Sequence, residues 1–349
     1  MKTILCYFLL SSSLISLWAQ NGFAFLTFGE LKLYSFHTKK LVDVSQNFNI
    51  YDYEISGNRV FILTTLLPRR SHYLRSQPPL TALYYTFFDF TQNDSAINYQ
   101  KVDILDVSSI TLSPDKGKLL VTILNGESDA QSNYHYEIIE IERNSRTAIK
   151  ELDNCNVLGW FSNDDLLLQK NNNLFLFSLT QKRIFELTNC LNLTQNQIIN
   201  FKTIDALSAV FQLKEELTKK IKLFIVTKTV AKEIYSLKSH RLDYVLSNNN
   251  EVILVVPKMN KRSMYYEMVK IDLTGEIIDT VNLFDLLNIT APFQKIFISE
   301  NVKNDVLILF TTNPDGQSAF YKIDLRKMDM PELLFRKPSY SVVEMMRLY

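Results

Sequence analysis

The stretch Leu112-Ser113-Pro114-Asp115-Lys116-Gly117-Lys118-Leu119 ends one apolar run and begins the next, with a polar turn between them. Ser, Asn and Asp suit such a turn because their side chains hydrogen-bond the turn backbone. The same mark, an apolar residue followed by Ser or Asp and turn residues, recurs at intervals of about 42 to 57 residues. Its other copies are Ile55-Ser56-Gly57-Asn58, Phe161-Ser162-Asn163-Asp164, Ile204-Asp205-Ala206, Leu246-Ser247-Asn248-Asn249 and Ile298-Ser299-Glu300-Asn301. Self-similarity at this period is typical of propeller blades.

Each mark belongs to a unit of four short apolar runs separated by turns. The unit that contains Ser113 predicts strands over residues 107–112, 119–124, 134–142 and 148–152. The next unit predicts strands over residues 156–161, 166–169, 174–179 and 184–187. No long segment has a convincing 3.6-residue apolar period, so helix should be minor and the fold class all-β. Glycine is scarce, at 8 residues, and Asn, Asp, Ser and Lys take its place in the turns.

The two ends of the chain complement each other. Residues 23–27, 30–36 and 41–45 read as strands two to four of a blade that has no first strand. The apolar run at residues 341–349 lies where the next first strand is due. We therefore predict a single β-propeller of seven four-stranded blades, with the first blade closed by the C-terminal strand. Such closure also removes the exposed strand edges of an open array.

At residues 112–119 the chain resembles the Ser-Pro-Asp-Gly type of repeat found in TolB-like propellers. Residues 173–179 and the pair Leu187-Thr188 are similar to the later strands of that repeat, and Asn313-Pro314-Asp315-Gly316 is a displaced echo of it. The resemblance covers most of residues 21–349 as a pattern, and two or three units match closely. It implies the propeller part only, because strands begin where TolB itself has an N-terminal α/β domain. The role of TolB is therefore not carried over.

The first residues indicate export. Lys2 precedes an apolar and Ser-rich run over residues 4–18, and Ala19 followed by Gln20 is a plausible cleavage point. We expect a signal peptide over residues 1–19 and a propeller domain over residues 20–349, located in the periplasm or outside the cell. An uncleaved anchor is the alternative. No later segment is long and apolar enough for a membrane span. A net charge of +1, from 38 basic and 37 acidic residues, does not suggest nucleic acid as a partner.

Catalytic signatures are absent from the sequence. It holds no G-x-S-x-G nucleophile elbow, no phosphate-binding loop and no H-E-x-x-H zinc motif. We therefore name no catalytic residue, cofactor or metal ligand. His135 and Glu137 share a strand face, which allows a metal or acid–base role, although a polar strand face is the simpler interpretation. Glu127 and Asp129 do not have the spacing of a calcium loop.

Two further groups of residues have two interpretations each. The run Tyr84, Tyr85, Phe87, Phe88 and Phe90 favours packing between blades over a ligand platform. Cys155 and Cys190, which follow the export segment, lie in neighbouring blade-to-blade connections and are a candidate disulfide. The bridge requires Cα atoms within about 7 Å, and free thiols are the alternative.

The loops between second and third strands are the candidate recognition surface. They are longer than the others at residues 67–80, 125–133, 214–220 and 257–263, and all lie at one end of the blades. Function gathers on loops held by a rigid scaffold. The first of these loops carries the candidate partner-binding residues Arg69, Arg70, Tyr73 and Arg75, of types frequent in interface hot spots. The competing interpretation is a solvated insertion whose arginines pair with Glu127 and Asp129.

Taken together, these patterns predict an exported, non-catalytic propeller that acts as a monomeric binding or scaffold module for a protein partner. The alternative is an enzyme whose active site is built from several blades at the channel mouth, since such a site leaves no short motif. Converging carboxylates or histidines at the inner strands would favour the enzyme, and a neutral lining would favour the binding module.

Overall fold

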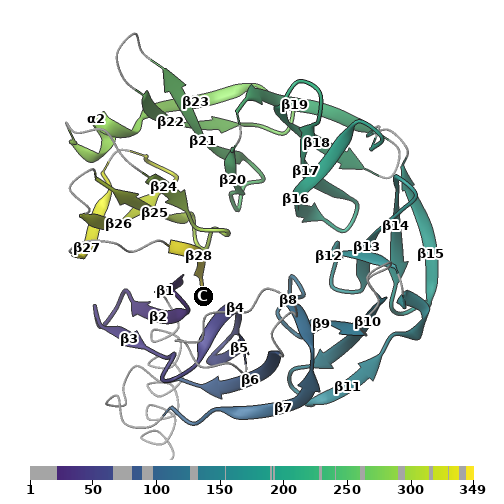
Figure 1. Cartoon of the computed structure of the whole chain (residues 1–349). Helices are drawn as coiled ribbons and strands as arrows, with labels where there is room; N and C mark the ends of the chain where they lie inside the picture. Colours follow the sequence, from purple (N-terminus) through teal and green to yellow (C-terminus); the bar gives the residue numbers. More distant parts are fainter. Residues whose placement is uncertain are drawn as a thin grey trace, which may run out of the picture. The chain divides into compact units, whose positions relative to one another are not determined.

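The structure is a computed structural model of the chain. It describes residues 22–65, 81–88, 97–125, 133–153, 155–188, 191, 193–227, 230–239, 241–259, 264–289, 295–313, 317–328, 330–337 and 343–349. Its strands form seven four-stranded antiparallel sheets, which are the blades of a β-propeller (Figure 1). The chain divides into two compact units, residues 1–110 with 341–349 and residues 111–340. The predicted fold class is confirmed.

Unit 1 holds blades 1 and 2. Blade 1 has the strand order β28-β1-β2-β3 and blade 2 the order β4-β5-β6-β7. The strands are β1 (Gly22–Thr27), β2 (Glu30–Ser35), β3 (Leu41–Asp43), β4 (Asn49–Ser56), β5 (Arg59–Thr65), β6 (Thr81–Phe87), β7 (Gln100–Leu105) and β28 (Val343–Leu348).

Blade 1 is completed by the end of the chain, as the sequence predicts. Strand β28 pairs antiparallel with β1, with Phe23 opposite Leu348 and Phe25 opposite Met346. The backbone N–H of Tyr349 donates to the carbonyl of Gly22 at 3.1 Å, and the Tyr349 hydroxyl donates to the carbonyl of Tyr34 at 3.1 Å. Tyr349 is buried in the same apolar cluster as residues of β1, β2, β4 and β5. The last residues are therefore part of the core of unit 1.

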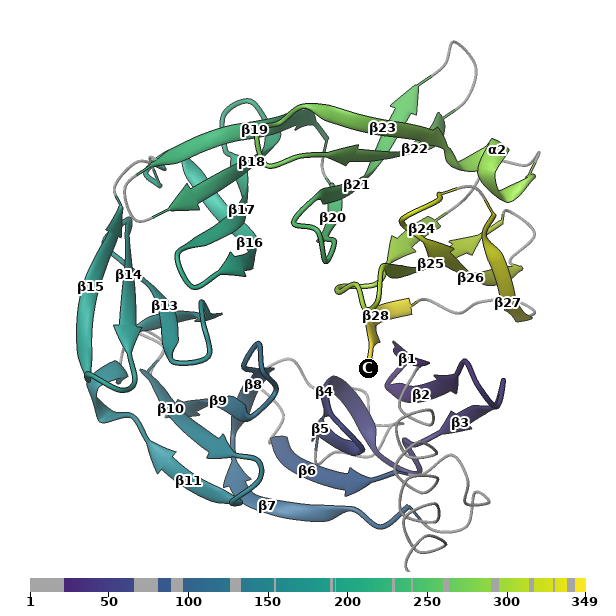
Figure 2. The ribbon, with the colours of Figure 1, turned by 180° about the vertical axis from the view of Figure 1, so that it is seen from behind.

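Unit 2 holds most of blade 3 and all of blades 4 to 7, each with its first strand innermost (Figures 1 and 2). Blade 3 comprises β8 (Val107–Leu112), β9 (Lys118–Asn125), β10 (Asn133–Glu140) and β11 (Ser145–Ala148), and blade 4 comprises β12 (Asn156–Trp160), β13 (Asp165–Lys170), β14 (Asn173–Ser178) and β15 (Arg183–Thr188). Blade 5 comprises β16 (Asn196–Asp205), β17 (Ser208–Glu215), β18 (Lys220–Thr227) and β19 (Ala231–Lys238). Blade 6 comprises β20 (Asp243–Leu246), β21 (Val252–Met259), β22 (Met264–Ile271) and β23 (Ile277–Asn282), and blade 7 comprises β24 (Lys295–Ile298), β25 (Val306–Thr312), β26 (Ser318–Asp324) and β27 (Glu332–Lys337).

The core of unit 2 lies between neighbouring blades. Alternate residues of a strand point to opposite faces, so a middle strand packs against a blade on each side. In β17, Ala209 and Phe211 join a cluster with β13 and β14 of blade 4, whereas Val210 joins a cluster with blade 6. Both faces are buried, which is why such strands read as continuous apolar runs rather than as alternating ones.

Helix is minor among the described residues. It consists of α2 (Leu283–Leu287) and a 3-10 turn at Lys150–Leu152. Asn282 caps α2 by accepting a hydrogen bond from the N–H of Phe284 at 2.9 Å. Within the described part of the chain, neither segment has the length and apolar character needed to cross a bilayer.

Turn residues behave as predicted for a glycine-poor chain. Left-handed conformations occur at Lys116, Asn144, Asn172 and Asn250, with φ of 61°, 50°, 65° and 60°. Asn144 closes the turn between β10 and β11 after Glu140, so that Ser145 lies opposite Glu140. The fourth strand of blade 3 consequently runs from Ser145 to Ala148. The prediction of this strand over residues 148–152 is wrong, because it places the strand too late in the chain. Residues 150–152 form the 3-10 turn instead.

The hairpins between second and third strands of blades 5 and 6 are tighter than predicted. Polar residues that the sequence assigns to these loops belong to the paired strands: Lys214 lies opposite Ile221, and Lys258 lies opposite Tyr265. Pro257 lies inside β21, where β20 has already ended, since the last pair between these strands is Asp243 with Val255. A proline there breaks no ladder hydrogen bond on that side. The connections shorten to residues 216–219 and 260–263.

Removing residues 341–349 should destabilise the protein, because β1 loses its neighbour and the buried side chains of Met346, Leu348 and Tyr349 are lost. We expect a lower melting temperature together with self-association on gel filtration, since an open strand edge invites pairing with other chains. Tyr349→Phe is the matched control: it keeps the ring and removes the hydroxyl that donates to the carbonyl of Tyr34, which should cost about 1 kcal/mol. An unchanged melting temperature in a monomeric truncated protein would contradict this role of β28.

Candidate functional site

The repeated serines close the turns between first and second strands. Ser113 Oγ donates to Asp115 Oδ1 at 2.6 Å and accepts from the N–H of Lys118 at 2.9 Å. Ser162 Oγ donates to Asp165 Oδ2 at 2.8 Å, and Ser299 Oγ, fully buried, donates to the carbonyl of Asn301 at 2.8 Å. The repeat mark is therefore a structural device that satisfies turn groups beside a buried strand end.

Blade 5 uses aspartate for the same purpose, as the sequence predicts. Asp205 Oδ1 accepts a hydrogen bond from the N–H of Leu207 at 2.7 Å. The carboxylate replaces the serine hydroxyl as the acceptor that ends the inner strand β16.

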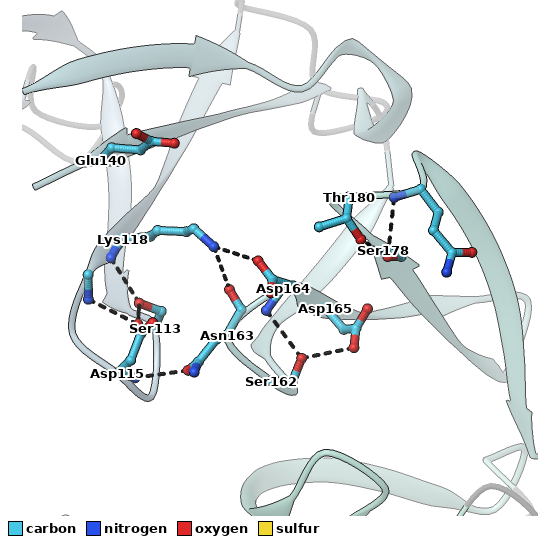
Figure 3. Close-up of polar contacts among 12 residues, drawn as sticks. Ser113, Asp115, Lys118, Glu140, Ser162, Asn163, Asp164, Asp165, Ser178 and Thr180 are labelled. Carbon is cyan, nitrogen blue, oxygen red and sulfur yellow. Dashed lines mark hydrogen bonds and ion pairs between the residues drawn. The ribbon is translucent and has the colours of Figure 1, made fainter. Parts of the chain in front are cut away.

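The turns of blades 3 and 4 are joined to each other (Figure 3). The N–H of Asp115 donates to Asn163 Oδ1 at 2.9 Å. Lys118 Nζ donates to the carbonyl of Asn163 at 3.0 Å and pairs with Asp164 Oδ1 at 2.6 Å. The hydroxyl of Ser113 holds Asp115, whose carboxylate also accepts from Gly117 N–H, and these bonds lower the pKa of Asp115. This network fixes one blade turn against the next.

The inner strands of unit 2 expose mainly uncharged and basic side chains. Asn156 on β12, Gln197 and Asn200 on β16 and Lys295 on β24 are exposed. The aspartates on these strands already have partners: Asp205 accepts from Leu207, and Asp243 Oδ1 pairs with Arg241 Nε at 2.7 Å. Arg241 also stacks over the ring of Phe297 at 4.1 Å from its centroid.

His135 contacts acidic groups from two segments. Its Nδ1 lies 2.7 Å from Asp153 Oδ1, and its Nε2 lies 3.8 Å from Glu137 Oε1. Arg146 Nη2 donates to Glu137 Oε1 at 2.8 Å. Glu137 is buried, so this arginine neutralises a carboxylate that burial would otherwise disfavour. In the part of the chain that the structure describes, no three His, Cys, Asp or Glu side chains are placed to hold a metal ion. The cluster ties β10 to the connection that enters blade 4.

Tyr136 also links β10 to the connection that enters blade 4. Its hydroxyl donates to the carbonyl of Cys155 at 2.7 Å and accepts from the N–H of Val157 at 3.2 Å. Burial raises the pKa of Tyr136 to about 12. The Cys155 side chain is half-buried. Cys190 lies outside the described residues, so the bridge between the two cysteines stays a prediction.

The aromatic run at β6 divides between its two strand faces. Tyr84 and Phe88 pack in the core of unit 1, where Phe88 meets Tyr349 edge-on at 5.6 Å between ring centroids. On the other face Arg59 stacks over Tyr85 and Phe87 at 5.2 and 4.8 Å. Phe90 lies outside the described residues. Packing accounts for Tyr84 and Phe88, as the sequence favours.

The predicted partner-binding residues Arg69, Arg70, Tyr73 and Arg75 lie outside the described residues, as do Glu127 and Asp129. The hairpins between second and third strands of blades 5 and 6 expose apolar side chains that sequence reasoning missed. Leu217 is 83% exposed and Met259 79% exposed, and Met264, opposite Met259, is 42% exposed. We call Leu217, Met259 and Met264 the hairpin-tip surface. The sequence signal for it was an apolar residue within each polar turn.

Comparison with solved structures finds the same fold in proteolytic enzymes. The propeller domain of the trilobed protease from Pyrococcus furiosus aligns with a TM-score of 0.51 at 13% identity, over 84% of this chain and 85% of that one. Prolyl oligopeptidase B from Galerina marginata aligns with a TM-score of 0.58 at 9% identity, over 94% of this chain and 53% of that one. TolB from Acinetobacter baumannii aligns with a TM-score of 0.45 at 13% identity, over 91% of this chain and 78% of that one.

At these identities the likeness shows the fold alone. The chain spans about half the length of the peptidases it matches, at 46% and 53% of the Pyrococcus horikoshii acylaminoacyl peptidase and the Porphyromonas gingivalis dipeptidyl peptidase 4. No known protein family matches the sequence, and no curated protein matches it either.

Replacing the buried serine of blade 7, Ser299→Ala, should lower the free energy of unfolding by about 1–3 kcal/mol, because the carbonyl of Asn301 and the N–H of Ile308 each lose a partner. Urea denaturation measures the change. The control is Ser236→Ala, on the exposed face of β19, which should change stability by less than about 0.5 kcal/mol. Equal effects of the two substitutions would show that the turn serine has no special role.

Proposed function

We propose that the protein is an exported, non-catalytic β-propeller that acts, as a monomer, as a binding module for a protein partner. The partner would dock on the hairpin-tip surface of blades 5 and 6. The observation that carries the proposal is the exposure of Leu217 and Met259 at the tips of equivalent hairpins in neighbouring blades. Isolated exposed apolar residues are common, but their place at the tips of equivalent loops on a rigid scaffold supports a role in recognition.

The chemistry of this surface suits a protein rather than a small ligand. Met259 and Met264 face each other across the hairpin, and methionine adapts its unbranched side chain to irregular apolar surfaces. Charged residues surround the tips in pairs: Lys222 with Glu215 at 3.3 Å, and Lys258 with Glu267 at 3.5 Å. An apolar centre with a polar rim is the usual anatomy of a protein–protein interface.

The competing function is an enzyme with an active site drawn from several blades. Carboxylates on the described inner strands of unit 2 are engaged with Arg241 or with turn N–H groups, which supports the binding module. The peptidases among the structural neighbours match this chain over about half of their own length, so their activity is not transferred here.

The binding surface can be tested with Leu217→Ser combined with Met259→Ser. The double variant should lose capture of the native partner from the envelope fraction while its melting temperature stays unchanged, because both side chains are already in solvent. Leu207→Ser is the matched control, since Leu207 is 56% exposed but lies on the turn at the other end of blade 5. Undiminished capture by the double variant, or equal loss with Leu207→Ser, would overturn the proposed surface.

Export can be tested on the protein recovered from its native source. Cleavage after Ala19 predicts a mature chain that begins at Gln20 and is released with the periplasmic or extracellular fraction. Intact mass and N-terminal sequencing decide the point. A chain that begins at Met1 and sediments with membranes would show the uncleaved anchor instead, and an unprocessed chain in the cytoplasmic fraction would exclude export.

A further inference from the structure

In blades 1, 6 and 7 a lysine on the third strand lies directly opposite a carboxylate on the fourth strand. The pairs are Lys32 with Asp43, Lys270 with Asp279 and Lys322 with Glu332. Unlike charges placed directly opposite each other stabilise a sheet, and like charges there destabilise it. The fourth strands of these three blades therefore supply acids that balance the lysines beside them.

Blade 5 departs from this arrangement. Lys220 on its third strand lies opposite Lys238 on its fourth strand, and Lys219 precedes Lys220 in the hairpin. All three are exposed, and their ammonium groups make no hydrogen bond or ion pair with the residues that the structure describes. A lysine on an outermost strand discourages pairing with other chains, but Lys232 already does this on β19, and the effect requires no second lysine opposite.

The carboxylates of blade 5 leave this positive charge largely unbalanced. Glu215 Oε1 lies 3.3 Å from Lys222 Nζ, and Glu233 Oε2 lies 3.9 Å from the same ammonium. The charge of Lys220 also acts on Glu215, but that carboxylate already pairs with Lys222. Glu216 makes no ion pair with any described residue. One unpaired carboxylate thus accompanies three unpaired lysines at this end of the blade.

The neighbouring segments add positive charge. Because the strands of a blade are antiparallel and consecutive, the hairpin between its second and third strands lies at the same end as the connections between blades. For blades 5 and 6 this end comprises residues 188–196, 214–222, 238–243 and 257–267, which hold nine lysines and arginines but four carboxylates. The whole chain has a net charge of +1, so the rest of it is net negative. Positive charge is therefore concentrated in the segments that carry Leu217 and Met259.

We propose that Lys219, Lys220 and Lys238 dock an acidic protein segment beside Leu217, with Asp or Glu side chains of the partner flanking an apolar one. This inference rests on the proposed function, because it names the chemistry of the partner that the hairpin-tip surface receives. Carboxylates accept charge-assisted hydrogen bonds from ammonium groups, and complementary charge selects the partner and speeds its encounter. A protein fits better than an anionic lipid surface, because Glu216 beside Leu217 would face the lipid phosphates.

The experiment measures binding of fluorescently labelled poly-L-glutamate to the full mature protein by anisotropy. We expect saturable binding, and Lys220→Gln combined with Lys238→Gln should weaken it about fivefold, as expected for exposed ion pairs. Raising chloride from about 50 mM to about 300 mM should shrink the difference between the two proteins, because salt screens exposed charges.

The matched control for the lost charge is Lys39→Gln with Lys40→Gln, which removes two exposed lysines from blade 1 and should leave the affinity unchanged. Equal weakening by both double variants would show a general charge effect and would overturn the proposal, as would the absence of saturable binding.

A single substitution separates recognition from a structural role. Lys238→Glu should raise the melting temperature by about 1 °C, because it replaces a repulsive cross-strand pair by an attractive one. The same variant should bind poly-L-glutamate more weakly than Lys238→Gln does. A lower melting temperature would show that Lys238 serves the fold, and would count against the proposal.

Capture of the native partner distinguishes this inference from the proposed function. Capture that is lost with Leu217→Ser and Met259→Ser, yet undiminished with the two lysine substitutions, would overturn the acidic segment and leave the hairpin-tip surface standing. Capture that is unaffected by the serine substitutions, with poly-L-glutamate binding still dependent on the lysines, would overturn that surface and keep the lysine site. Lysine-dependent binding to phosphatidylglycerol–phosphatidylcholine vesicles without binding to poly-L-glutamate would identify a membrane and overturn the protein partner.

Discussion

Burial of both faces of the middle strands is the constraint on which the blades of unit 2 depend. A strand such as β17 presents Phe211 to blade 4 and Val210 to blade 6, so neither face can be satisfied by its own sheet. Each apolar cluster consequently belongs to two blades, and a blade is stable only beside a neighbour. Because both faces of these strands are buried, the backbone groups at the strand ends lie beside apolar side chains and need hydrogen-bond partners within the turns.

That demand explains the serine and aspartate marks. At the end of each inner strand the backbone leaves the ladder beside buried side chains, and its N–H and carbonyl groups need partners there. Ser113, Ser162 and Ser299 supply them, and Asp205 does so in blade 5. The residues that reveal the repeat in the sequence are therefore those that solve a local hydrogen-bonding problem, and this is why they recur while most other positions diverge.

The sequence predicts features that follow from such local rules and fails where tertiary contacts decide. Blade number, strand order and the place of β28 follow from the period of the marks. The position of β11 in the chain does not follow from this period, because it depends on Asn144 adopting a left-handed conformation in the preceding turn. The hairpins of blades 5 and 6 read as loops because Lys214 and Lys258 are polar, yet these residues continue the ladders. Polarity alone cannot distinguish a solvent-exposed strand end from a loop.

The candidate sites show the same division. His135 and Glu137 share a strand face by spacing alone, but Asp153 and Arg146 join them only through the fold. The hairpin-tip residues Leu217 and Met259 are further from any local rule, because only the folded hairpins of blades 5 and 6 leave these apolar side chains in solvent. The partners of the turn carboxylates are likewise set by the fold, since Asp115 and Asp165 accept from turn hydroxyls and Asp164 pairs with Lys118 of the neighbouring blade.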